Sequence, residues 1–189
     1  CDFLIGGEID VCLQPIIRMY LVRKEINPDE FVATWYQENN EWHHGPFDVW
    51  EDDLDSLPWP DRSAMPNEFY VRPDTGKPMA TIQVGRGCFG RCTYCLTPVI
   101  SGRCVRLRSP ENVVAEMREC VKIHGIHDFF LRADTFTADG KWVVELCDLI
   151  CNDDVLSGNI SWTANARVKP LSGETLVAMS KAGCFCVDS

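Results

Sequence analysis

Three cysteines, Cys88, Cys92 and Cys95, lie within eight residues of this chain at spacings of four and three. Iron–sulfur clusters are normally held by four cysteine thiolates. A loop that offers three thiolates can bind a [4Fe-4S] cluster and leave one iron open for a ligand that is not part of the protein. The pattern therefore predicts a cluster at which a small molecule can bind.

Two other metal sites stay open as alternatives. A structural zinc site and a ferredoxin-type electron carrier each need a fourth protein ligand, and Cys104, nine residues after Cys95, is a candidate. Zinc sites favour two paired knuckles, whereas here only Cys92 and Cys95 have that spacing. An iron–sulfur electron carrier or a zinc-stabilised binding module is thus the non-enzymatic alternative.

The chain holds eleven cysteines in all, a count that is also typical of secreted disulfide scaffolds. The number is odd, no signal peptide is visible, and pairing among three crowded cysteines would strain their small loops. No apolar run approaches the roughly 18 to 20 residues needed to cross a bilayer. We expect a cytoplasmic protein without a membrane partner. Small buried hydrophobic positions are predicted for Cys104, Cys120, Cys147, Cys151, Cys184 and Cys186.

The charge of the chain is uneven. Residues 1–80 hold 16 acidic and 6 basic residues, whereas residues 81–189 hold 12 of each, giving a net charge of -10. Such a chain lacks the basic surface that attracts a phosphate backbone. The charge therefore argues against a nucleic-acid partner.

From residue 80 onward, short apolar strands alternate with amphipathic helices. Strands are predicted at 80–84, 128–132, 160–164 and 184–187. Helices are predicted to begin at Ser109-Pro110, at Thr137 or Asp139, and after Ser172 as N-cap, the last with Leu176 and Met179 inside. This order predicts a parallel sheet with right-handed crossovers, with its chemistry at the carboxyl ends of the strands. The cysteine loop directly follows the first of these strands.

The first part of the chain is less regular. Residues 2–5 are predicted to form a buried strand, followed by a helix from about Asp10 to Lys24 that begins at Pro15 or is interrupted by it. Residues 38–79 contain six prolines and no sustained period, which predicts a linker or an extended docking segment. Because the chain begins with Cys1 and ends in a strand that has only just started, we expect a fragment.

The CxxxCxxC motif, with Tyr94 before its last cysteine and a βα series around it, resembles the radical S-adenosylmethionine (radical SAM) superfamily. Residues 86–88, 102–103, 108–112 and 134–137 resemble the cobalamin-associated branch of that superfamily. Residues 2–8 resemble the last strand and turn of its cobalamin-binding domain, and residues 54–62 its interdomain linker. The resemblance covers nearly the whole chain.

The resemblance implies an α/β fold with three parts. Residues 1–37 would be the C-terminal end of a flavodoxin-like cobalamin-binding domain, and residues 38–79 an acidic, proline-rich linker. Residues 80–189 would be the N-terminal part of the radical SAM domain. That part would contain the first four strands of a partial (β/α) TIM-like barrel.

In that family the open iron chelates the amino and carboxylate groups of S-adenosylmethionine, and the reduced cluster cleaves it to methionine and a 5'-deoxyadenosyl radical. The implied cofactors are the [4Fe-4S] cluster, S-adenosylmethionine and cobalamin, whose site would lie mostly outside this chain. Tyr94 would lie near the adenine, and Asp134 would accept hydrogen bonds from the methionine ammonium. Arg167 could reach the methionine carboxylate, and Asp188 and Ser189 would contact the ribose. The sequence assigns no catalytic residue.

The leading expectation is a cobalamin-dependent radical enzyme. It would be a methyltransferase, or a cyclase resembling the anaerobic magnesium-protoporphyrin ester cyclase group. Its partners would be a small-molecule substrate and a one-electron reductant such as ferredoxin or flavodoxin. An RNA methylthiotransferase shares the three-cysteine loop and is the enzymatic alternative, against which the acidity argues.

Overall fold

The computed structural model describes residues 3–22, 32–47, 49–167 and 171–188. Two compact units emerge from it. One contains Cys1–Asp53 together with Gly87–Cys104, and the other contains Leu54–Arg86 together with Val105–Ser189. Within the described part of the chain, no helix is long and apolar enough to cross a membrane.

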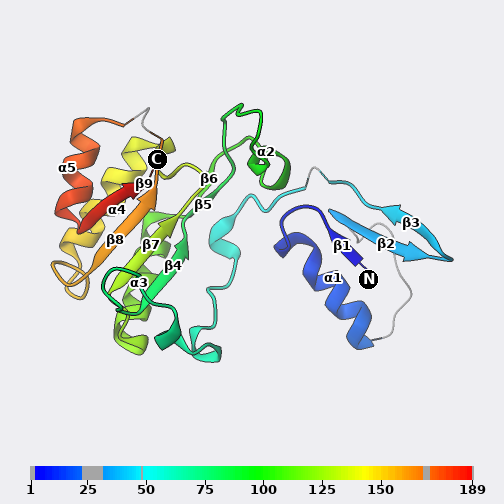
Figure 1. The fold of residues 1–189 in the computed structure, drawn as a ribbon, viewed down its shortest axis with the longest axis horizontal. Helices are drawn as coiled ribbons and strands as arrows, with labels where there is room; N and C mark the ends of the chain where they lie inside the picture. The colour runs from blue at the N-terminus through cyan, green and yellow to red at the C-terminus, as the bar shows by residue number, and fades with distance from the viewer. Residues whose placement is uncertain (1–2, 23–31, 48, 168–170, 189) are drawn as a thin grey trace. The chain divides into compact units, whose positions relative to one another are not determined.

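The second unit is built on a four-stranded parallel sheet (Figure 1). Its strands follow the order β4 (Met79–Gln83), β7 (Asp128–Arg132), β8 (Ser161–Asn165) and β9 (Cys184–Asp188). The helices α3 (Pro110–His124), α4 (Gly140–Asn152) and α5 (Gly173–Lys181) connect successive strands. This arrangement confirms the predicted βαβαβαβ order.

The helix ends follow the capping residues of the sequence. Ser109, Asp139 and Ser172 each accept a hydrogen bond from a backbone N–H of the first turn that follows them. Helix α3 ends at Gly125, which adopts the left-handed conformation with φ of 64°. Of the two starts considered for the second helix, Asp139 caps α4, and a short 3₁₀ turn, Phe136–Ala138, precedes it.

The core lies between the sheet and these three helices. Alternate strand residues face it, among them Ile82, Phe129, Leu131, Trp162 and Ala164. The helices contribute the residues expected from their 3.6-residue period, such as Val113, Met117, Val143, Leu146, Ile150 and Met179. Leu176 was expected inside but is 43% exposed, because α5 is a short helix with few buried positions.

The first unit contains an antiparallel sheet in the order β1 (Phe3–Ile5), β2 (Thr34–Glu38) and β3 (Glu41–His44). The prediction of a buried first strand was wrong, since Leu4 is 57% exposed. Helix α1 (Asp10–Val22) begins at Asp10, with Pro15 inside it, so the alternative start at Pro15 was wrong.

Residues 38–79 contain more structure than the sequence indicated. Asn39 and Asn40 both have positive φ and form the two-residue turn between β2 and β3, a conformation that asparagine tolerates. Three 3₁₀ turns follow at Leu54–Ser56, Arg62–Ala64 and Asn67–Phe69. An Asn-Asn pair between alternating residues was the signal for the hairpin, and the prediction of a linker or an extended docking segment overlooked it.

Candidate functional site

The cysteine loop runs from Gly87 to Cys104, between the short strands β5 (Gly85–Arg86) and β6 (Arg106–Leu107), which pair antiparallel. Sequence reasoning placed the loop after β4 but did not find this hairpin, because each strand has only two residues. A short helix, α2 (Thr97–Ile100), follows the last cysteine of the motif.

The three predicted ligands differ in exposure. Cys88 is buried at 9% exposure, Cys95 is half-buried and Cys92 is exposed. The Cys88 Sγ accepts a hydrogen bond from the Gly90 N–H at 3.3 Å, and the Cys95 N–H donates to the Cys92 carbonyl at 3.2 Å. Within the described residues, no three His, Cys, Asp or Glu side chains converge as metal ligands would. The structure thus places the three thiols on one loop without joining them at one point.

Backbone contacts close the base of this loop. The Cys88 N–H donates to the Gly102 carbonyl at 3.2 Å, and a Cβ on Gly87 would lie only 2.0 Å from the Cys104 carbonyl oxygen. Gly87 also has a φ of 84°, which side chains other than glycine rarely adopt. Gly87 is therefore required by the turn that starts the loop.

A tryptophan from the N-terminal segment of the same unit packs on the C-terminal part of the loop. The Trp50 Nε1–H donates to the Ile100 carbonyl at 3.0 Å. A Cβ on Gly102 would meet the Trp50 ring at 3.3 Å, so the ring packs closely over this glycine. The acidic segment that sequence reasoning assigned to a linker thus contributes a contact to the cysteine loop.

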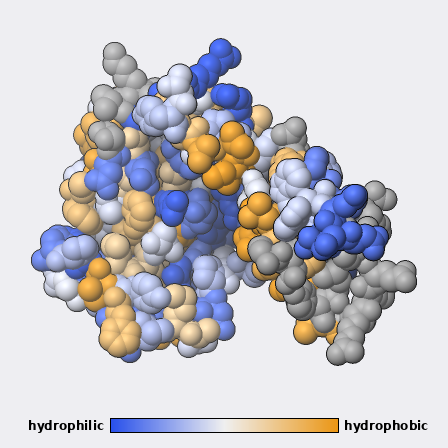
Figure 2. Space-filling model, turned by 45° about the vertical axis from the view of Figure 1, so that its right-hand side comes forward, coloured by the Kyte–Doolittle hydropathy of each residue, from blue (hydrophilic) through white to orange (hydrophobic). Residues whose placement is uncertain are grey.

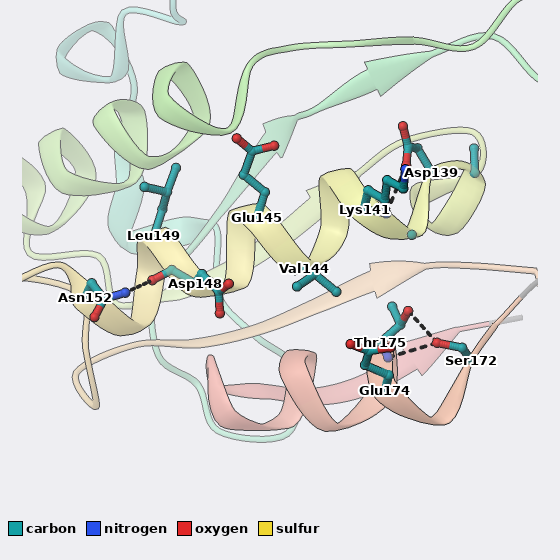
Figure 3. Close-up of a pocket in the computed structure, with 12 residues that line it drawn as sticks. Asp139, Lys141, Val144, Glu145, Asp148, Leu149, Asn152, Ser172, Glu174 and Thr175 are labelled. Atoms are coloured by element: carbon teal, nitrogen blue, oxygen red, sulfur yellow. Dashed lines mark hydrogen bonds between the residues drawn. The ribbon is translucent and has the colours of Figure 1, made fainter.

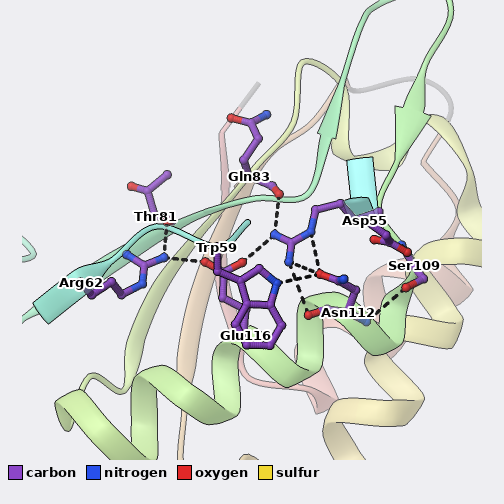
Figure 4. A network of polar contacts seen from close by, with 9 residues as sticks. Asp55, Trp59, Arg62, Thr81, Gln83, Ser109, Asn112 and Glu116 are labelled. Carbon is purple, nitrogen blue, oxygen red and sulfur yellow. Dashed lines mark hydrogen bonds and ion pairs between the residues drawn. The ribbon is translucent and has the colours of Figure 1, made fainter. Parts of the chain in front are cut away.

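A buried polar network lies in the sheet unit, where the chain returns from the loop through β6 (Figure 4). Glu116 of α3, at 2% exposure, accepts from the Arg108 Nη1 at 2.6 Å and from the Arg62 Nη2 at 2.7 Å. The Arg108 guanidinium also donates to the Gln83 carbonyl at 3.0 Å, and its own backbone N–H donates to the Val84 carbonyl at 2.9 Å. Arg108 therefore ties the end of β6 to the end of β4.

The segment before the sheet joins this network. The Trp59 Nε1–H donates to the Asn112 Oδ1 at 3.0 Å, and the Asp55 carboxylate accepts from the Ser109 N–H at 3.0 Å. Arg62 also donates to the Thr81 carbonyl at 3.0 Å. Residues 55–62 are thus fixed against α3 and β4 by polar contacts (Figure 4).

The remaining predicted site residues lie at separate places. Tyr94 is 88% exposed on the cysteine loop. Asp134 is exposed just after β7, Arg167 is exposed just after β8, and Asp188 is exposed at the end of β9. The last three therefore follow the carboxyl ends of three neighbouring strands, as the parallel order predicts. Ser189 lies outside the described residues.

The six other cysteines for which buried positions were predicted differ in exposure. Cys120 and Cys147 are buried as predicted, and burial raises the pKa of Cys120 to about 11 and that of Cys147 to about 12. Cys151 and Cys184 are half-buried, whereas Cys104 and Cys186 are exposed, so the prediction of buried positions was wrong for these last two. None of the described cysteines forms a disulfide.

A shallow cavity of about 800 Å³ lies between α4 and α5 (Figure 3). Acidic side chains of α4 and α5 border it, including Glu145, Asp148 and Glu174. None of the predicted cofactor residues lines this cavity. On the face shown in Figure 2, exposed hydrophobic residues form separate patches among hydrophilic ones.

The sequence of this chain is similar to those of known enzymes. No family model matches it. An uncharacterized methyltransferase of Pyrococcus horikoshii, PH0819, is 25% identical over 98% of this chain. The anaerobic magnesium-protoporphyrin IX monomethyl ester cyclase of Rubrivivax gelatinosus is 30% identical over 72% of it.

Solved structures agree with these relatives. The radical S-adenosylmethionine methyltransferase TsrM of Kitasatospora setae, with tryptophan and a SAM analog bound, matches 98% of this chain with a TM-score of 0.76 and 18% identity. A second TsrM structure, with cobalamin and a [4Fe-4S] cluster bound, matches with a TM-score of 0.71 and 15% identity. By sequence this chain is related to a methyltransferase and to a cyclase, and its fold is that of the radical S-adenosylmethionine methyltransferase TsrM.

This chain is short beside the proteins that it resembles. It spans 39% of the length of the Pyrococcus protein, 24% of the cyclase and 36% of the TsrM chain in the first structure. The fold is the predicted partial barrel, with four parallel strands and their helices. The likeness to TsrM concerns the fold.

Proposed function

We propose that this chain is the cluster-binding part of a radical SAM enzyme, which uses a [4Fe-4S] cluster on Cys88, Cys92 and Cys95. The observation that carries the proposal is the donor set: three thiols on one loop, Gly87–Cys104, which starts and ends in a fixed hairpin. Thiolates are the ligands of iron–sulfur clusters, and three of them leave one iron of a cubane open. The chemistry of the donor set therefore fits this cofactor.

The bound cluster would supply one electron to the sulfonium of S-adenosylmethionine, which then yields methionine and a 5'-deoxyadenosyl radical. The residues of the chain hold and orient these partners, which is the protein's share of such chemistry. Cys88, Cys92 and Cys95 hold the cluster, and Tyr94 lies near the adenine.

Three residues at the carboxyl edge of the sheet are assigned to the rest of the cofactor. Asp134 accepts hydrogen bonds from the methionine ammonium, and Arg167 donates to its carboxylate. Asp188, with Ser189, contacts the ribose. The positions of Asp134, Arg167 and Asp188 after neighbouring parallel strands support these assignments.

The proposal also covers the organisation of the whole protein. Residues 1–37 are the C-terminal end of a cobalamin-binding domain, and residues 80–189 are the N-terminal part of the radical SAM domain. Residues 38–79 are the linker between these two domains. Similarity to a methyltransferase and to a cyclase supports either cobalamin-dependent methyl transfer or oxidative cyclisation of a small-molecule substrate. Ferredoxin or flavodoxin serves as reductant.

The first experiment is electron paramagnetic resonance of the protein reconstituted anaerobically with iron and sulfide and then reduced. We expect a cubane signal that changes when S-adenosylmethionine is added, because the added molecule becomes a ligand of the open iron. A cubane signal that stays the same on addition would contradict the open-iron site and favour an electron carrier. A protein that binds zinc in place of a cluster would contradict the proposal altogether.

Replacing Cys104 by alanine provides the matched control. Cys104 is exposed and lies at the end of the same loop. The three-ligand site predicts unchanged cluster content in the Cys104→Ala protein. Loss of the cluster would instead identify Cys104 as the fourth ligand of a closed site.

A further inference from the structure

Helices α3, α4 and α5 all pack on one face of the parallel sheet. Phe129 and Leu131 of β7, and Trp162 and Ala164 of β8, are buried in the core with the helices. Because side chains alternate along a strand, Phe130, Arg132, Thr163 and Asn165 lie on the opposite face. We call this opposite face, formed by β4, β7, β8 and β9, the helix-free face.

The amino end of the helix-free face is closed by Arg72. Its guanidinium donates to the Asp128 carboxylate at 2.7 Å and to the Ser161 hydroxyl at 3.2 Å, and lies 3.9 Å from the centre of the Phe185 ring. The hydrogen bonds that Arg72 donates raise its pKa, and the bond to Asp74 has a larger effect than the bond to Asp128. At this end of the face, the charge of Arg72 is therefore paired with those of Asp74 and Asp128.

The carboxyl end of the same face is different. The strand register pairs Gln83 with Arg132 and Asn165 with Asp188, and Arg132 and Asn165 each lie one residue beyond the Leu131–Ala164 pair. A row of four polar side chains therefore crosses the sheet, with neighbouring strands about 4.8 Å apart. The row runs in the order Gln83, Arg132, Asn165 and Asp188. The cation Arg132 therefore lies between two neutral amides, and the anion Asp188 lies at the end of the row.

Two members of this row lack partners among the described residues. Arg132 is exposed and takes part in none of the ion pairs there. The Asn165 Oδ1 is buried from solvent and accepts no hydrogen bond from the described residues. A buried acceptor without a donor is costly, and in native proteins nearly all find one. A ligand with an anionic group and a neighbouring N–H donor would satisfy both.

We propose that Arg132 and Asn165 bind the α-carboxylate and the α-ammonium of a free amino acid, which is the substrate. The guanidinium fork of Arg132 matches a carboxylate, and the Asn165 Oδ1 accepts from the ammonium. The spacing of adjacent strands suits two groups that are separated by one carbon atom. That this amino acid is the substrate rests on the proposed function. That an amino acid binds rests on the row of polar side chains.

S-adenosylmethionine carries the same two groups, so its binding has to be separated from that of a substrate. In the proposed function, the open iron already engages the amino and carboxylate groups of S-adenosylmethionine. The Arg132 and Asn165 variants should therefore leave the affinity for S-adenosylmethionine unchanged.

The test is equilibrium dialysis of each of the standard l-amino acids against the anaerobically reconstituted chain in the presence of S-adenosylmethionine. We expect at least one amino acid to bind. Its α-carboxamide, which lacks the carboxylate, should bind at least about tenfold more weakly. Arg132→Gln should weaken binding of the acid by a similar factor and leave binding of the amide unchanged. Asn165→Leu should weaken both, while Asn165→Asp, which keeps the acceptor, should retain binding.

Lys141→Gln is the matched control, since it removes an exposed cation of the same unit from α4, in the helix layer. It should bind amino acids like the unaltered protein. The proposal is overturned if no amino acid binds, if Arg132→Gln binds the acid normally, or if the variants lose affinity for S-adenosylmethionine instead.

Cluster content and formation of 5'-deoxyadenosine, measured on the same samples, separate this proposal from the proposed function. Amino-acid binding without S-adenosylmethionine cleavage would keep the site and remove its role as a substrate site. Cleavage without amino-acid binding would leave the proposed function standing and remove the site.

Discussion

Phe129, Trp162 and Leu146 are fully buried in the sheet unit, whereas Cys92 of the cysteine loop is exposed and Tyr94 is 88% exposed. The sheet unit combines a continuous core with the buried Arg62–Glu116–Arg108 network. The cysteine loop is held at its ends by Gly87, Gly102 and Trp50, and its centre has little packing of its own. Metal binding often supplies the folding energy of such loops. The comparison indicates that the sheet is stabilised by its own side chains, whereas the centre of the loop would be stabilised by the cluster of the proposed function.

The largest effect is expected from Cys92→Ala. Removing one of three thiolates should abolish reductive cleavage of S-adenosylmethionine, measured as 5'-deoxyadenosine formed, because the cluster is no longer held. The circular dichroism spectrum should stay unchanged, since Cys92 is exposed and the core does not depend on it. Retained cleavage would disprove the three-ligand site, and an unfolded variant would disprove the separation between loop and sheet.

The second effect concerns the sheet unit alone. Glu116→Gln leaves the charges of Arg62 and Arg108 without their shared counter-ion in a buried place, which should lower the free energy of unfolding by about 3 to 5 kcal/mol. Urea unfolding measures this change. Glu145→Gln, at an exposed position of α4, is the matched control and should change stability by less than about 0.5 kcal/mol. Equal effects of the two changes would show that the network adds no stability.

The third effect sharpens the description of the loop. Gly87→Ala should reduce the cluster content of the reconstituted protein, because its Cβ would meet the Cys104 carbonyl oxygen at 2.0 Å. Gly76→Ala is the control: Gly76 has a similar positive φ of 67°, but no atom lies within 4 Å of the added Cβ. Both changes carry the backbone cost of about 1 kcal/mol, and only the first should affect iron content. Normal iron content in Gly87→Ala would show that the loop base adapts.

The smallest effect is a pH dependence of the sheet unit. Burial raises the pKa of Cys147 to about 12, above its usual value near 9, so the folded protein keeps a proton that the unfolded chain releases. The contribution of this thiol to stability is complete below pH 9 and falls as the pH rises from about 9 to 12. Urea unfolding across this range should show a shallower decline for Cys147→Ala. An identical decline in both proteins would contradict the raised pKa.

Much of the sheet unit was predictable from sequence because its local signals agree with one another. Ser109-Pro110 and Ser172 mark helix starts, and strands such as 128–132 carry the hydrophobic pattern of a covered face. The hairpin β5–β6 was not predictable in this way, since strands of two residues have no period. The Asn39-Asn40 turn had a signal, but acidic and aromatic residues around it conceal the alternation.

The residues of the candidate sites also divide into those with a local sequence signal and those without one. The spacing of Cys88, Cys92 and Cys95 by itself indicated a three-thiolate loop, and the strand order placed Asp134, Arg167 and Asp188 after neighbouring strands. Arg132 and Asn165 carried no signal, because an arginine or an asparagine at the end of a strand is commonly solvated. Only the register of β7, β8 and β9 places these two side chains in one row.

The sequence by itself therefore determined the spacing of the three cysteines and the order of strands and helices in the sheet unit, because these depend on residue types at short spacings. The tertiary structure decided that Glu116 is shared by two arginines 46 residues apart, Arg62 and Arg108. It also decided that Trp50 packs on the cysteine loop and that α3, α4 and α5 all pack on the same face of the sheet. These features depend on contacts between distant segments, whose partners are fixed only when the chain has folded.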